Sequence, residues 1–96
     1  MAKFTTRVVL HGVEESDTET YDKLHEAMEK AGFLRKIFGS DDKWYDLPPA
    51  EYNLDADLTC AAVRDKARAA ANSVWKDNGV LTTEGVRQWI GLKPAK

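Results

Sequence analysis

Apolar and polar positions alternate along the first stretch of the chain, from Phe4 to His11. This period of two, with β-branched and aromatic residues, is typical of a strand with one buried face. The core-facing set is Phe4, Thr6, Val8 and Leu10, and the opposite set is Thr5, Arg7, Val9 and His11. Gly12 follows and ends the predicted strand.

Helical spacing of apolar positions appears in two later segments. The first predicts a helix over 17–31, with Ser16 and Glu19 as a capping box and Gly32 after its end. The second predicts a helix that begins at Asp57 or Thr59, with Asn78-Gly79 closing the region. The apolar stripes are Tyr21, Leu24, Met28 and Ala31 in the first helix, and Cys60, Val63, Ala67, Ala70 or Ala71, and Val74 in the second.

The central part of the chain predicts three short strands. Residues 34–38 and 43–47 form the arms of a hairpin around the turn Gly39-Ser40-Asp41-Asp42. Pro48-Pro49 interrupts the second arm, because proline cannot donate a hydrogen bond to a neighbouring strand. Residues 50–54 resume the alternation and predict a separate strand, with Tyr52 packed under a helix.

The C-terminal part predicts a second hairpin, with arms over 80–83 and 87–92 around Glu84-Gly85. A short helix over 83–90 is the alternative. We expect residues 93–96 to form a loose tail.

The order of these elements is β-α-β-β-α-β, with additional hairpin arms in the middle and at the C-terminus. It predicts an α+β domain of the ferredoxin-like class, in which two helices cover one face of an antiparallel sheet. A chain of 96 residues fits a single domain, 1–96.

Composition and charge narrow the classes of function. A net charge of −2 gives no general attraction for nucleic acid, so a nucleic-acid site has to be a local patch. No apolar run approaches the roughly 18 residues of a membrane span, and no signal sequence opens the chain. The single cysteine, Cys60, rules out an intrachain disulfide. We therefore expect a cytoplasmic protein without a membrane partner.

Four segments resemble, in order, a family of small phage and prophage proteins of uncharacterised function. They are KFTTRVVLH, YDKLHEAMEKAGF, KWYDLPPAEYN and VLTTEGVRQWIGL. In segment order and hydrophobic pattern the chain also resembles, more distantly, the GhoS-type antitoxin endoribonucleases. That resemblance implies a compact ferredoxin-like fold and an action on messenger RNA, while no catalytic motif of the group maps residue by residue onto this chain.

The central hairpin carries the candidate binding residues. Arg35, Lys36 and Lys43 can converge there, beside Trp44 and Tyr45. Such a mixture suits single-stranded nucleic acid, because cations follow the phosphates and rings stack on the bases. Successive strand residues face opposite ways, so one of the two adjacent rings is expected to be core or interface. Trp89 has the same ambiguity.

His11 and Arg7 are the candidate catalytic residues. Both lie on the outer face of the first predicted strand. Imidazole transfers protons near neutral pH and a guanidinium holds phosphate, so the two would be a minimal RNA-cleaving pair. A solvated histidine beside an arginine is the alternative.

Other residues that could carry chemistry have structural interpretations. Asp41 and Asp42 could bind magnesium, but they are also the residues that a turn requires, and we favour the turn. His25 is expected at the edge of a helix with a hydrogen-bond partner, and Cys60 in the core. No metal site and no cofactor are predicted.

Two functions follow from these features. The first is an antitoxin-like protein that binds single-stranded RNA through the basic and aromatic hairpin, with endoribonuclease activity as an added hypothesis. The second is a protein–protein interaction module that modulates a host protein, as a homodimer formed by pairing of an unpaired edge strand.

Overall fold

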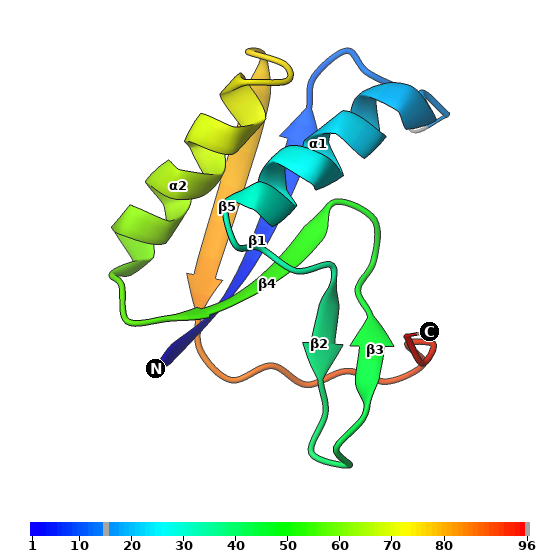
Figure 1. Cartoon of the computed structure of the whole chain (residues 1–96), viewed down its shortest axis with the longest axis vertical. Coiled ribbons are helices and arrows are strands. Elements are labelled where there is room, and N and C mark those ends of the chain that lie inside the picture. The colour runs from blue at the N-terminus through cyan, green and yellow to red at the C-terminus, as the bar shows by residue number, and fades with distance from the viewer. Residues whose placement is uncertain (15, 96) are drawn as a thin grey trace.

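The computed structural model describes residues 1–14 and 16–95, which form two helices and five strands (Figure 1). The strands are β1 (Ala2–Leu10), β2 (Lys36–Phe38), β3 (Trp44–Asp46), β4 (Glu51–Ala56) and β5 (Asn78–Glu84). The helices are α1 (Thr18–Lys30) and α2 (Cys60–Asn72). The predicted α+β class and the β-α-β-β-α-β order are confirmed, with β3 as the additional central arm.

The main sheet is antiparallel and has the order β4-β1-β5. A single bridge between Leu34 and Asn53 adds the chain just before β2 to the outer edge of β4. Strands β2 and β3 form a separate two-stranded sheet that projects from this edge, away from α1 and α2 (Figure 1). Both helices lie on one face of the main sheet.

The core lies between the main sheet and the two helices. The four core-facing residues predicted for the first strand are all buried, and Tyr52 is fully buried as expected. The buried cluster comprises Phe4, Val8, Leu10, Leu24, Met28, Phe33, Tyr52, Val63, Ala67 and Ala71. The small residues of α2 allow that helix to lie close to β1 and β5.

Both helices begin at a side-chain cap. Thr59 caps α2, as predicted, and accepts a hydrogen bond from the Ala62 amide at 3.1 Å. For α1 the cap is Asp17, one residue after the predicted Ser16, and it accepts from the Thr20 amide at 3.1 Å. The capping box prediction was wrong: the two carboxylate oxygens of Asp17 accept one from the Thr20 amide and one from the Thr20 hydroxyl, and the negative charge is favourable at a helix N-terminus.

Of the predicted C-terminal hairpin, the first arm is confirmed and the second arm is wrong. Strand β5 begins at Asn78, where we had expected only the close of a helix, and continues to Glu84 along the edge of β1. Residues 87–92 form neither a strand nor the alternative short helix. Gly85 takes a φ of 144°, and the chain then leaves β5 and crosses to the β2–β3 hairpin (Figure 1).

The tail also differs from the expectation. Pro94 bridges Tyr45, the Asp46 amide donates to the Lys93 carbonyl, and the Ala95 amide donates to the Trp44 carbonyl, both at 2.9 Å. Residues 93–95 therefore pair with the free edge of β3, and Lys96 lies outside the described residues. Of the helices in the described part of the chain, none has the length and apolarity to cross a bilayer.

Candidate functional site

The register of the hairpin separates its side chains into two faces. Lys36 pairs with Asp46, Ile37 with Tyr45, and Phe38 with Trp44. Because directly opposed residues share a face, Ile37 and Tyr45 point together toward the protein, where Ile37 is buried and Tyr45 is half-buried. The other two pairs point outward.

Two aromatic rings and one cation meet on the outward face. The Lys36 ammonium lies 5.0 Å from the centroid of the Trp44 ring, within the range of a cation–π contact. The Phe38 and Trp44 rings pack edge to face, with centroids 5.1 Å apart and an interplanar angle of 62°. Even so, Phe38 is 48% exposed and Trp44 is 38% exposed. The two rings hold each other in place and still present surface to solvent.

Tyr45 has a different role from Trp44. Its ring lies 5.9 Å from the ring of Trp89, and its hydroxyl donates a hydrogen bond to Asp41. This hydrogen bond lowers the pKa of Asp41 and raises the pKa of Tyr45. Of the two adjacent rings that the sequence could not separate, Trp44 is the outward one, and Tyr45 and Trp89 join the hairpin to the C-terminal segment.

Asp41 and Asp42 serve the turn. The second oxygen of Asp41 accepts from the Lys43 amide at 3.2 Å, and Asp42 takes a left-handed φ of 61° at the tip. The interpretation of these residues as a turn is confirmed. Within the ranges that the structure describes, no group of three or more His, Cys, Asp and Glu side chains could hold a metal ion.

Arg35 and Lys43 complete the basic character of this region. Both are exposed, and in the described residues neither forms an ion pair. We call Arg35, Lys36, Phe38, Lys43 and Trp44 the hairpin surface. It contains four of the five predicted binding residues, and Phe38 takes the place of Tyr45.

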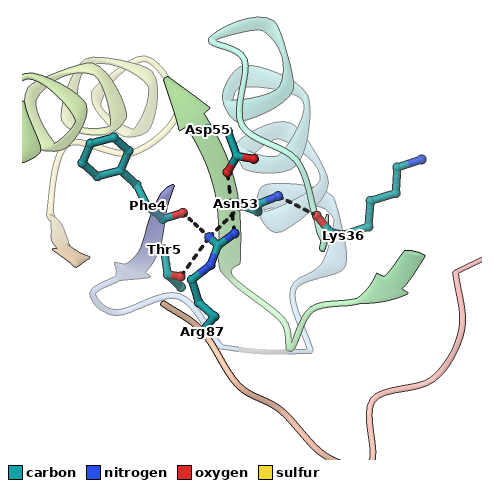
Figure 2. Close-up of polar contacts among 6 residues, drawn as sticks. All are labelled: Phe4, Thr5, Lys36, Asn53, Asp55 and Arg87. Atoms are coloured by element: carbon teal, nitrogen blue, oxygen red, sulfur yellow. Dashed lines mark hydrogen bonds and ion pairs between the residues drawn. The ribbon is translucent and has the colours of Figure 1, made fainter. Parts of the chain in front are cut away.

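Arg87 anchors the hairpin and the C-terminal segment to the main sheet (Figure 2). Its guanidinium donates to the Phe4 carbonyl at 2.8 Å and to the Asn53 side-chain oxygen at 2.7 Å. It also pairs with Asp55 at 3.6 Å. The amide of the Asn53 side chain donates in turn to the Lys36 carbonyl at 3.3 Å. This network fixes the backbone position of Lys36 relative to β4.

His25 lies at the edge of α1 with a partner, as predicted. Its Nδ1 is 2.7 Å from the hydroxyl of Tyr52. Burial lowers the pKa of His25, the positive charge of Arg35 lowers it further, and Asp22 opposes the shift. His25 and Arg35 therefore lie close together, although they are ten residues apart in the sequence.

Arg7 and His11 are both exposed on the face of the sheet opposite the helices. Four positions along an extended chain separate their Cα atoms by about 13 Å. Both side chains reach the same face, but contact with one phosphate requires the Arg7 side chain to extend along β1 toward His11. The β2–β3 hairpin lies beyond the outer edge of β4, the edge that does not pair with β1 (Figure 1).

Cys60 is half-buried in the stripe that faces the core. Its thiol donates a weak hydrogen bond to the Thr82 carbonyl, at 3.5 Å. Cys60 packs against the core and is less buried than the sequence predicted.

The sequence interpretation missed Phe38 and Arg87. Phe38 could have been found, because it is directly opposite Trp44 once the hairpin register is fixed. Arg87 gave no local signal, since its partners Asp55, Asn53 and Phe4 are all distant in the sequence, the nearest of them 32 positions away.

Comparisons with known proteins found no relative for this chain: no family model, no curated protein and no solved structure matches it.

Proposed function

We propose that this protein is an antitoxin-like accessory protein, of phage or prophage type, that binds single-stranded RNA through the hairpin surface. The observation that carries the proposal is the outward cluster of Lys36, Phe38 and Trp44, in which a cation and two partly exposed rings occupy one face of a short hairpin. Rings of this kind stack on bases of any sequence, and cations beside them neutralise phosphates.

Charge supports a local site. The whole chain carries −2, so phosphate contacts have to come from a few cations without carboxylate partners. Arg35, Lys36 and Lys43 are such cations in the described residues. Binding through three cations falls with added salt, with a slope of about −0.7 per phosphate contact on single strands.

The test is the affinity for a labelled single-stranded RNA at low and at moderate salt, together with the integrity of the RNA. We expect salt-dependent binding by the wild type and its loss in the double variant Arg35→Ala, Lys36→Ala. An absence of binding at low salt contradicts the proposal. Cleavage that His11→Ala abolishes would extend it to an endoribonuclease, with His11 and Arg7 as the proposed pair.

The variant Trp44→Ala tests the contribution of a single stacking ring to RNA binding. Loss of one stacking ring costs about 1–3 kcal/mol of binding, or roughly 5- to 150-fold in affinity. Trp75→Ala is the matched control, because Trp75 has a similar exposed fraction and lies just after α2, where its ring nitrogen donates to the His11 carbonyl. Equal losses from the two variants would place the effect in general stability and not in the hairpin surface.

The second candidate function is a protein-binding module, and the exposed C-terminal segment favours it. Val86 and Ile90 are 91% and 97% exposed, and such apolar side chains are common at protein interfaces. The edge of β5 is less open to homodimer formation than the sequence suggested, because Arg68 donates to the Asn78 carbonyl at 2.7 Å and Cys60 contacts the Thr82 carbonyl. Capture of one stoichiometric host protein, without RNA binding, would favour this function.

A further inference from the structure

A hollow of ≈ 210 Å³ lies between α1 and the start of the hairpin. Its lining includes His25, Phe33 and Leu34. Its polar lining consists of Glu29, Arg35, Lys36 and Asp46. Lys36 belongs to both this hollow and the hairpin surface, so the two are adjacent.

The charges around the hollow are balanced and unpaired. Two cations and two carboxylates line it, yet none of the four side chains forms an ion pair in the part of the chain that the structure describes. Groups of both signs that line one hollow without pairing are available to a ligand that has both donors and acceptors. A phosphate would meet two carboxylates there, so the balance disfavours an anion.

His25 adds a hydrogen-bonding group without a formal charge. Its Nδ1 shares a hydrogen bond with the Tyr52 hydroxyl, 2.7 Å away, which leaves Nε2 as the ring nitrogen that can meet a ligand. The lowered pKa of His25 agrees with a neutral ring at pH 7.

We propose that this hollow receives one unstacked guanine base of a single-stranded RNA that is bound on the hairpin surface. Guanine matches the lining because its N1–H and N2–H groups can donate together to one carboxylate, while its O6 and N7 accept from arginine or lysine. The other bases lack that pair of adjacent donors. The volume is below the roughly 300–1,000 Å³ of pockets for larger ligands, and it suits a single base.

This inference rests on the proposed RNA binding and adds base preference to it. The experiment compares labelled oligouridylates of equal length that carry one central guanine, adenine, cytosine or uracil. We expect the guanine oligonucleotide to bind about tenfold more tightly than the other three. Equal affinity for all four would overturn the guanine site and leave the RNA-binding proposal intact, whereas no binding of any oligonucleotide would contradict the RNA-binding proposal.

Single substitutions identify the residues that are responsible for the preference for guanine. Glu29→Gln should reduce the affinity for the guanine oligonucleotide to the affinity for the other three. The matched control is Glu26→Gln, elsewhere on α1, which should keep the preference. If the preference for guanine survives Glu29→Gln, then Glu29 is not the carboxylate that accepts from the base.

Binding of the nucleoside gives a readout that needs no phosphate. Guanosine at millimolar concentration should shift the ring proton resonances of His25, while uridine should leave them in place. Shifts of equal size with both nucleosides would contradict a guanine site.

Discussion

Aromatic side chains are fully buried in the core under the helices, but they are partly exposed on the outward face of the hairpin. Phe4 is 0% exposed at the centre of the core, whereas Phe38 is 48% exposed beside Trp44. Burial of an aromatic side chain contributes to the stability of the fold, so stabilisation of the fold explains the presence of the core rings. The hairpin rings gain much less from folding, and the surface that they keep in solvent is available for binding.

The largest effect on the free energy of unfolding should come from a substitution in the core under the helices. We expect Phe4→Ala to lower the free energy of unfolding by about 3–5 kcal/mol, because it removes a fully buried ring and leaves a cavity. Phe38→Ala, the same substitution on the hairpin, should cost about 1 kcal/mol or less. Chemical denaturation of both variants measures the two values. Equal losses would mean that the hairpin is as much part of the core as β1.

The next effect tests the connection between the two regions. Arg87→Met should lower the free energy of unfolding by about 1.5–3 kcal/mol, because the Phe4 carbonyl and the Asn53 side chain lose a charged donor. Gln88→Met, at the exposed neighbouring position, is the control and should change stability by less than about 0.5 kcal/mol. Amide resonances of β2 should move in Arg87→Met alone. Unchanged resonances there would show that the Asn53 contact does not position the hairpin.

The smallest effect concerns His25, between the two regions. Its pKa is lowered in the folded protein, so below about 6.5 the unfolded chain binds more protons than the folded one. Stability should therefore fall as the pH drops from 7.5 through about 6.5, until the folded histidine is protonated as well. Denaturation at pH 7.5 and 5.5 measures this loss. The loss should shrink in His25→Gln and persist in His11→Gln, and the reverse result would assign the titration to the exposed histidine.

Much of the fold followed from local patterns. The alternation from Phe4 to Leu10, the helical spacing of Leu24 and Met28, and the Thr59 cap each depend on residues that are near in sequence. The same reasoning from local patterns gave a wrong prediction for the C-terminal segment. Residues 87–92 have strand-like composition, but Arg87 finds its partners on β1 and β4, and residues 93–95 pair with β3. Contacts so distant in sequence leave no periodic signal.

Local patterns in the sequence predict the order of helices and strands, the core face of β1, the burial of Tyr52 and the basic and aromatic content of the hairpin. These features depend on side-chain period and on turn residues, which are local properties. Packing between distant parts of the chain is what places Trp44 outward with Phe38, turns Tyr45 toward Trp89 and brings His25 and Arg35 to one hollow. Each of these depends on how β2 and β3 are placed against β4, α1 and the C-terminal segment, and that placement is set by Asn53 and Arg87 through contacts between distant parts of the chain.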